Sequence, residues 1–192
     1  MEKCEYFIKE LQYINNNDIL YSLKTMINLL PDYFFHMPAS TTGKYHPAFA
    51  LGDGGLLRHT KSAVRIAYEI LNNETLGTAF NGEEKDLIIM AVLLHDGLKS
   101  GLIETQYTQV NHPLLMADYI RKNASNLKLN STQLNLVCRM IETHMGPFNK
   151  DYKGNTVLPV PTDRYQKFVH MCDYLASKKF LNINFNGNEI VE

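Results

Sequence analysis

Cysteine is scarce in this chain, and the cysteines present fit no paired spacing. Cys4, Cys138 and Cys172 are odd in number and form no CxxC motif. This usage argues for reduced thiols in a cytosolic protein and against a disulfide framework. The stretch from Met1 to Glu5 also lacks the basic and apolar regions of a signal peptide. We therefore expect a cytoplasmic protein.

Long apolar runs and an excess of one charge are also missing. No stretch of about 18 uncharged apolar residues exists, so we expect neither a membrane span nor a membrane partner. The formal net charge of −1 does not indicate binding of long nucleic acid, although a local basic patch is compatible with it. No internal repeat or low-complexity block divides the chain, so we expect one domain.

The sequence contains enough apolar residues for a real core and predicts helices almost throughout. Its 192 residues are 45% hydrophobic and 20% charged, as in ordinary globular proteins. Apolar periodicity, with Asp18 and Ser131 as capping residues, predicts helices over about 2–14, 18–30 and 56–72, a central helix that ends with the apolar run 87–94, a helix that begins at His112–Pro113, one from Ser131 that stops at Gly146–Pro147, and a last one over 163–178. Roughly seven helices with irregular connections make an all-α fold. For the asparagine-rich tail, 181–192, a short strand, an extended arm and disorder all stay open.

The segment from Pro31 to Gly55 breaks this pattern. It holds three prolines, four glycines and several aromatic residues, without periodicity. Long irregular loops in compact domains are usually functional or disordered, and the aromatic content disfavours disorder. We predict an ordered loop that crosses a site.

A histidine and an aspartate stand together at the end of the most apolar run. His95 and Asp96 follow directly on residues 87–94, which read as a buried helix. A carboxylate in such surroundings must be hydrogen-bonded, paired or bound to a cation. Metal ligation is one interpretation, and a satisfied core histidine with a buried ion pair is the other.

Further histidines and one more aspartate fall on predicted buried faces or at helix starts. Each alone is more often a satisfied core residue than a ligand. Together, four inward-facing imidazoles and two carboxylates in one small core need a shared reason, which a pair of divalent metal ions supplies. Mixed nitrogen and oxygen ligands suit Mn, Fe, Co, Ni or Zn better than Ca or Mg. The candidate ligands are His59, His95, Asp96, His112, His144 and Asp173.

The order H…HD…H…H…D resembles the HD-domain metal-dependent phosphohydrolase superfamily in its two-metal form. Similarity over about residues 34–178 extends to segments around Lys44–His46, Gly54–Thr60, Thr143–Gly146 and Val169–Leu175, which resemble the HD domain of bacterial 3′-to-5′ exoribonucleases. The HD-type hydrolase of symmetrical dinucleoside tetraphosphates shares the ligand order but not the proline-to-glycine loop. The resemblance implies one all-α HD-domain bundle over 1–192, with a helical extension at 1–30, a core at about 34–178 and a tail at 179–192.

Two departures from those exoribonucleases limit the comparison. No OB-fold precedes the HD domain in this chain, so we expect no long RNA strand as a ligand. The usual His-Asp-x-Gly-Lys motif reads His95-Asp96-Gly97-Leu98-Lys99 here, with the glycine moved by one place and the lysine kept.

The resemblance also implies roles for individual residues. His59, His95, Asp96 and Asp173 would hold one metal, and Asp96 would bridge to a second held by His112 and His144. A hydroxide between the ions would attack phosphorus, and Lys99 would meet the phosphate as a catalytic and binding residue beside Asp96. The candidates for binding the rest of the substrate are Lys44, Tyr45, His46 and Arg58; Lys44 and Arg58 could equally be solvated surface charges. His36 and His170 are interpreted as structural.

These expectations favour a phosphohydrolase that cleaves a phosphoester or pyrophosphate bond of a nucleotide or short oligonucleotide. A rival within enzymes is a 3′-to-5′ exonuclease on single-stranded nucleic acid. A third reading is a catalytically silent nucleotide-binding HD module, and a fourth is that the histidines merely pack. The sequence leaves open whether the chain forms a homo-oligomer.

Overall fold

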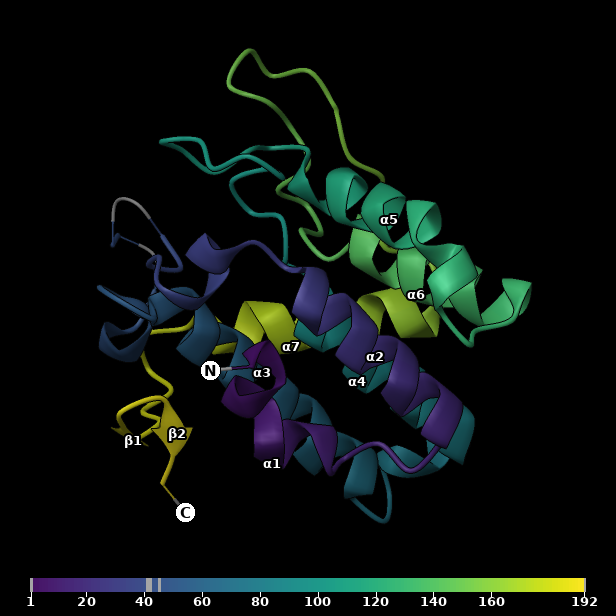
Figure 1. Cartoon of the computed structure of the whole chain (residues 1–192). Helices are drawn as coiled ribbons and strands as arrows, with labels where there is room; N and C mark the ends of the chain where they lie inside the picture. The colour runs from purple at the N-terminus through teal and green to yellow at the C-terminus, as the bar shows by residue number, and fades with distance from the viewer. Residues whose placement is uncertain (1, 41–42, 45, 192) are drawn as a thin grey trace.

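The computed structural model describes residues 2–40, 43–44 and 46–191, and these are mostly helical (Figure 1). The α-helices are α1 (Ile8–Leu11), α2 (Asn17–Leu29), α3 (Gly55–Asn72), α4 (Gly82–Leu94), α5 (His112–Lys122), α6 (Ser131–Glu142) and α7 (Arg164–Ala176). Short 3₁₀ turns occur at Lys3–Phe7, Asp32–Phe35, Ala48–Ala50, Gly77–Ala79 and Ala124–Asn126. The all-α prediction is confirmed, with one two-residue antiparallel hairpin, β1 (Phe185–Asn186) and β2 (Glu189–Ile190), near the C-terminus.

Helix α4 is the centre of the bundle. Every residue from Asp86 to Leu94 is buried, because α2, α3, α6 and α7 all contact this helix (Figure 1). A helix that is apolar all round is stable only when neighbours cover every face. Its start is fixed by a capping box, in which the Asn81 side chain and Glu84 each accept from the other's backbone N–H. Because neighbouring helices cover α4 on every face, His95, which follows its last residue, lies in the interior.

The N-terminal helix is shorter than predicted. Of residues 2–14, Lys3–Phe7 form a 3₁₀ turn and Ile8–Leu11 the single turn of α1. The link to α2 is held by the buried carboxylate of Asp86, which accepts hydrogen bonds from the backbone N–H groups of Asn15 and Asn16 at 3.1 and 2.8 Å. Two predicted caps are also wrong by one or two residues. Asn16 caps α2 in place of Asp18, and Asn130 caps α6 in place of Ser131. The predicted start of the last helix at Asp163 is confirmed, and the Asp163 side chain caps α7.

The C-terminal hairpin packs against α3 and the preceding loop, so the short strand is the correct one of the three alternatives for the tail. The Phe185 and Phe49 ring centroids lie 5.2 Å apart. The Arg58 guanidinium donates to Asn188 Oδ1 at 2.8 Å, and Lys61 Nζ lies 2.5 Å from Glu189 Oε1. Two residues of α3 thus hold the tail.

Helix α3 begins where the long loop passes close to it. Gly54 has a φ of +69°, and a Cβ on Gly55 would lie 2.3 Å from the carbonyl oxygen of Ala50. Only glycine fits that approach without a shift of the backbone. The pair therefore brings residues 46–53 against the helix that carries His59.

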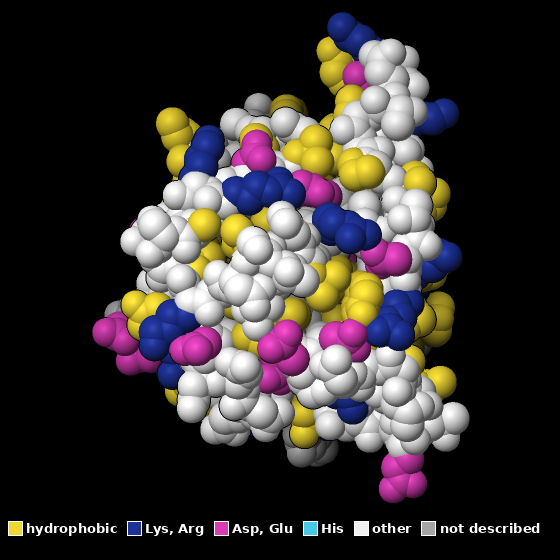
Figure 2. All heavy atoms as spheres, turned by 90° about the vertical axis from the view of Figure 1, so that its right-hand side faces the viewer, with side chains coloured by type: hydrophobic (Ala, Val, Ile, Leu, Met, Phe, Trp, Pro, Cys, Tyr) yellow, Lys and Arg dark blue, Asp and Glu magenta, His cyan; other side chains and the backbone are white. Residues whose placement is uncertain are grey.

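The surface carries both signs of charge. Figure 2 shows Lys and Arg side chains interspersed with Asp and Glu over one face, where no histidine of the described residues is visible. None of the helices in the described part of the chain is long and apolar enough to cross a membrane.

Candidate metal centre

Five segments bring the six predicted ligands together inside the bundle. Asp96 is central: its Oδ1 lies 2.9 Å from His112 Nε2 and 3.6 Å from His144 Nε2. Its Oδ2 lies 3.5 Å from His95 Nε2 and 3.9 Å from His59 Nε2. All five of these side chains are buried.

Asp173, on α7, completes the cluster on the other side. Its Oδ1 lies 3.0 Å from His59 Nε2 and 3.5 Å from His95 Nε2. Two overlapping groups of side chains, each with ligand atoms within 4.8 Å of one another, could therefore hold a metal ion: His59, His95 and Asp173, and His95, Asp96 and His144.

The histidine rings are oriented by backbone carbonyls. In three of them Nδ1 lies 2.6 to 2.8 Å from the carbonyl oxygen of the residue three places earlier: His95, His112 and His144. A carbonyl can only accept, so each Nδ1 carries a proton, and Nε2 is the ring nitrogen that each of these histidines turns to the centre. This second-shell bond is typical of metal-ligating histidines.

The donor atoms of the centre fit divalent cations. His112 Nε2 and His144 Nε2 lie 3.2 Å apart, so two lone pairs face each other in a buried site. His95 Nε2 and Asp96 Oδ1 are buried and make no hydrogen bond with the described residues. Buried acceptors without donors are costly, and a cation among them removes that cost. The mixture of imidazole and carboxylate suits transition-metal ions.

The pKa values of the side chains in the centre show how positive charge stabilises its two buried carboxylates. Burial alone would raise the pKa of Asp96 and of Asp173, yet Lys99 and His95 hold the first, and His59 and His95 hold the second, well below the usual range. Burial acts to lower the pKa of His95, but the two carboxylates raise it to about 10. Two carboxylates thus stay ionised in the interior.

The centre opens into a cavity of about 450 Å³. Of the residues that the sequence assigned to phosphate or substrate binding, Lys99 and His46 line this cavity. The Lys99 ammonium contacts the Asp96 carboxylate. The His46 ring packs edge-on against that of His59, with centroids 5.1 Å apart, and burial, with the neighbouring charges, lowers the pKa of His46 to about 3.

The other substrate candidates fare differently. Lys44 is exposed and is not among the described residues that line the cavity, while Tyr45 lies outside the described residues. Arg58 is partly exposed and is not among the described residues that line the cavity. Its guanidinium donates to the carbonyls of Phe49, Leu51 and Asp53 at 2.5 to 2.9 Å, and so holds the loop.

Sequence reasoning missed several residues of the cavity wall. His170, interpreted as structural, does donate from Nδ1 to the His144 carbonyl at 2.7 Å, but it also lines the cavity with Phe148, Tyr174 and Lys178. The available signal was the four-residue spacing from His170 to Tyr174 to Lys178, which predicts one helix face next to Asp173.

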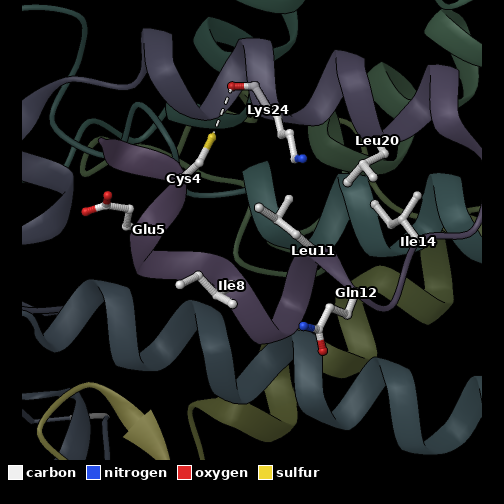
Figure 3. Close-up of a pocket in the computed structure, with 8 residues that line it drawn as sticks. All are labelled: Cys4, Glu5, Ile8, Leu11, Gln12, Ile14, Leu20 and Lys24. Carbon is white, nitrogen blue, oxygen red and sulfur yellow. Dashed lines mark hydrogen bonds between the residues drawn. The ribbon is translucent and has the colours of Figure 1, made fainter. Parts of the chain in front are cut away.

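A second cavity, of about 390 Å³, lies between the N-terminal segment and α2 (Figure 3). Its wall is mainly apolar, with Ile8, Leu11 and Leu20, and the Cys4 thiol donates to the Lys24 carbonyl at 3.6 Å. It holds no imidazole and no paired carboxylates. The chemistry of the described residues is therefore concentrated at the first cavity.

A helical bundle with a buried histidine and aspartate centre defines a class of metal-binding protein, and the comparison with known families agrees. The HD domain family matches residues 56–178, so the chain belongs to the HD-domain family. Members of this family are typically metal-dependent phosphohydrolases, which makes that general activity the one the fold and centre indicate. No curated protein and no solved structure matches the chain.

Proposed function

We propose that this protein is a phosphohydrolase that cleaves a phosphoester or pyrophosphate bond of a nucleotide or short oligonucleotide. The observation that supports it best is the pair of facing Nε2 atoms of His112 and His144, 3.2 Å apart beside Asp96 Oδ1. Such an arrangement of acceptors is stable only around positive charge.

Two divalent ions fit the six residues. His59, His95, Asp96 and Asp173 would hold one ion, and Asp96, His112 and His144 the other. When bound, such ions activate water and neutralise charge on phosphoryl oxygens.

The protein's own residues position the substrate. Asp96 fixes the Lys99 ammonium at the inner end of the cavity, where it can donate to a phosphoryl oxygen. His46 lines the same space and stays neutral at physiological pH, since its pKa is about 3. Burial of the centre keeps bulk water away from the reacting phosphate.

The cavity suits a small organic phosphate. Its volume of about 450 Å³ lies within the range of roughly 300 to 1,000 Å³ typical of small-ligand sites. Phe148 and Tyr174 on its wall are 63% and 42% exposed, which leaves aromatic surface at the open side. A nucleobase can pack on such surface.

The test begins with metal analysis of the purified protein and a hydrolysis screen with Mn²⁺. The screen contains phosphomonoesters, bis(p-nitrophenyl) phosphate, cyclic dinucleotides and short labelled oligonucleotides. We expect about two ions per chain and hydrolysis that EDTA abolishes. Asp96→Asn should lose at least about a hundredfold in rate, whereas His36→Asn, a histidine on the surface, should keep full activity.

Two results would redirect the proposal. Fewer than one ion per chain, with no turnover on any substrate, would indicate the silent nucleotide-binding module. Stepwise degradation of an oligonucleotide from its 3′ end, without hydrolysis of mononucleotides, would indicate the exonuclease instead.

A further inference from the structure

The outer part of the cavity contains a lysine that no acidic side chain of the described residues pairs with. Lys178 lies just past the end of α7 and lines the cavity, with its Nζ 3.6 Å from the centroid of the Tyr174 ring. A cation at a helix C-terminus also gains from the helix dipole. The other lysine of the wall, Lys99, has its charge matched by Asp96. Lys178 is thus the cation of this wall that is available to an anionic ligand.

The position of Lys178 separates it from the metal centre. Asp173 belongs to the centre, and the five steps from Asp173 to Lys178 cover about 7.5 Å at helical rise. A single phosphate group bound at the centre does not extend that far. The cation is therefore placed for a second anionic group of the same ligand.

Phe148 supplies an apolar surface to the same cavity. It follows His144 by four residues, lines the cavity, and leaves 63% of its surface exposed. Exposed aromatic rings at the edge of a phosphate site bind nucleobases by stacking, whatever the base.

We propose that Phe148 and Lys178 form an outer subsite, in which Phe148 stacks on a nucleobase and Lys178 binds a second phosphate of the same substrate. This rests on the proposed function and narrows it: the preferred substrate is a nucleotide with a further phosphate beyond the one at the metal centre, as in a dinucleotide or a nucleoside bisphosphate.

Stacking can be tested without any turnover. The sequence contains no tryptophan, so Phe148→Trp introduces a single fluorescent reporter. Tyr152→Trp is the matched control, because Tyr152 lies on the same loop, is 89% exposed and is not on the cavity wall. With Mn²⁺ present, and over times short against turnover, adenosine 3′,5′-bisphosphate should quench Phe148→Trp saturably and leave Tyr152→Trp unchanged. Equal quenching of both variants would overturn the stacking role.

The phosphate contact is tested with a pair of ligands that differ only in the second phosphate. In the Phe148→Trp background we expect adenosine 3′,5′-bisphosphate to bind about tenfold more tightly than AMP, as for one charge-assisted contact. Adding Lys178→Gln should bring the two affinities to parity. Lys179→Gln, an exposed neighbour off the cavity wall, should keep the tenfold preference. Parity without Lys178→Gln, or a preference that survives it, would overturn the role of Lys178.

The failures of the two proposals are distinguishable. Hydrolysis of bis(p-nitrophenyl) phosphate without a bisphosphate preference would refute the subsite and leave the enzyme in place. Quenching and preference without any hydrolysis would support the subsite and refute the enzyme. Circular dichroism and thermal unfolding of each variant show whether a loss of binding reflects a loss of folding instead.

Discussion

Metal binding should stabilise the folded protein strongly, because the centre holds acceptor atoms that only positive charge can satisfy. His95 Nε2 and Asp96 Oδ1 are buried without hydrogen bonds, and His112 Nε2 faces His144 Nε2 at 3.2 Å. The unfolded chain has no such arrangement, so ions bind the folded state selectively. At a free Mn²⁺ concentration a hundredfold above Kd, one site adds about 2.7 kcal/mol.

That free energy corresponds to a measurable change in melting temperature. For a chain of 150 to 250 residues, 1 kcal/mol moves Tm by about 2 to 4 °C. One occupied site should therefore raise Tm by about 5 to 11 °C over chelator-treated protein, and a second site should raise it further. Differential scanning fluorimetry across a Mn²⁺ titration measures this directly.

Two variants decide whether the shift comes from this centre. Asp96→Asn removes the carboxylate that contacts His59, His95, His112 and His144 alike, so its Tm should barely respond to Mn²⁺. His36→Asn, on the surface, should respond like the wild type. If the wild type shifts by less than 1 °C at millimolar Mn²⁺, or if Asp96→Asn shifts equally, the argument from buried acceptors is refuted.

Three further predictions concern the structure around the centre. Arg58→Ala should lower the free energy of unfolding by about 2 kcal/mol or more, because the loop carbonyls lose a charged donor; a raised KM with unchanged urea denaturation would instead restore a substrate role. Gly55→Ala should cost about 1 to 3 kcal/mol in the same assay, since its Cβ would lie 2.3 Å from a loop carbonyl oxygen. The control Gly82→Ala, where a Cβ meets nothing within 4 Å, should cost almost nothing. Burial, only partly opposed by a lysine, raises the pKa of Glu10 above its ordinary value of 4.5. The folded state thus holds that proton more tightly than the unfolded state does. The contribution of protonated Glu10 to the free energy of unfolding is therefore lost as the pH rises through the raised pKa. Wild type should therefore lose stability relative to Glu10→Gln between pH 4 and pH 7. A gain in stability relative to Glu10→Gln over this range would contradict a raised pKa for Glu10.

The helices and the six clustered residues were predictable because local signals specify them. The apolar run from residue 87 to 94 can only be a buried element, and its end places His95 and Asp96 in the interior. Periodicity placed His59 on the buried face of α3, and the structure has it fully buried. These features need no knowledge of which helix packs on which.

The roles of the charged residues of α3 could not be predicted in the same way. Lys61 is 1% exposed, with Glu10 Oε2 at 3.6 Å and Glu189 Oε1 at 2.5 Å. Arg58 has a partner at Asn188, 130 residues away. Neither set of partners was predictable, because periodicity identifies the face of a helix that meets the core but not a face that a distant tail covers.

The histidine rings of the centre are oriented in two ways, some by contacts within their own turn of the chain and one by a contact with another helix. His95 and His144 follow the C-terminal turns of α4 and α6, where backbone carbonyls lack intrahelical partners, and His112 begins α5 just after the loop carbonyl that it uses. Each ring uses the carbonyl three residues earlier, and for His112 and His144 that carbonyl also accepts the histidine's own backbone N–H, at 3.0 and 3.3 Å. These three rings are therefore oriented within their own turns. His59 lies inside α3, where such carbonyls are occupied, and its Nδ1 has no hydrogen-bond partner among the described residues. Its orientation depends on Asp173 across the contact between α3 and α7. Loosening that helix contact should consequently disturb the His59 side of the centre while the side formed by His112 and His144 keeps its geometry.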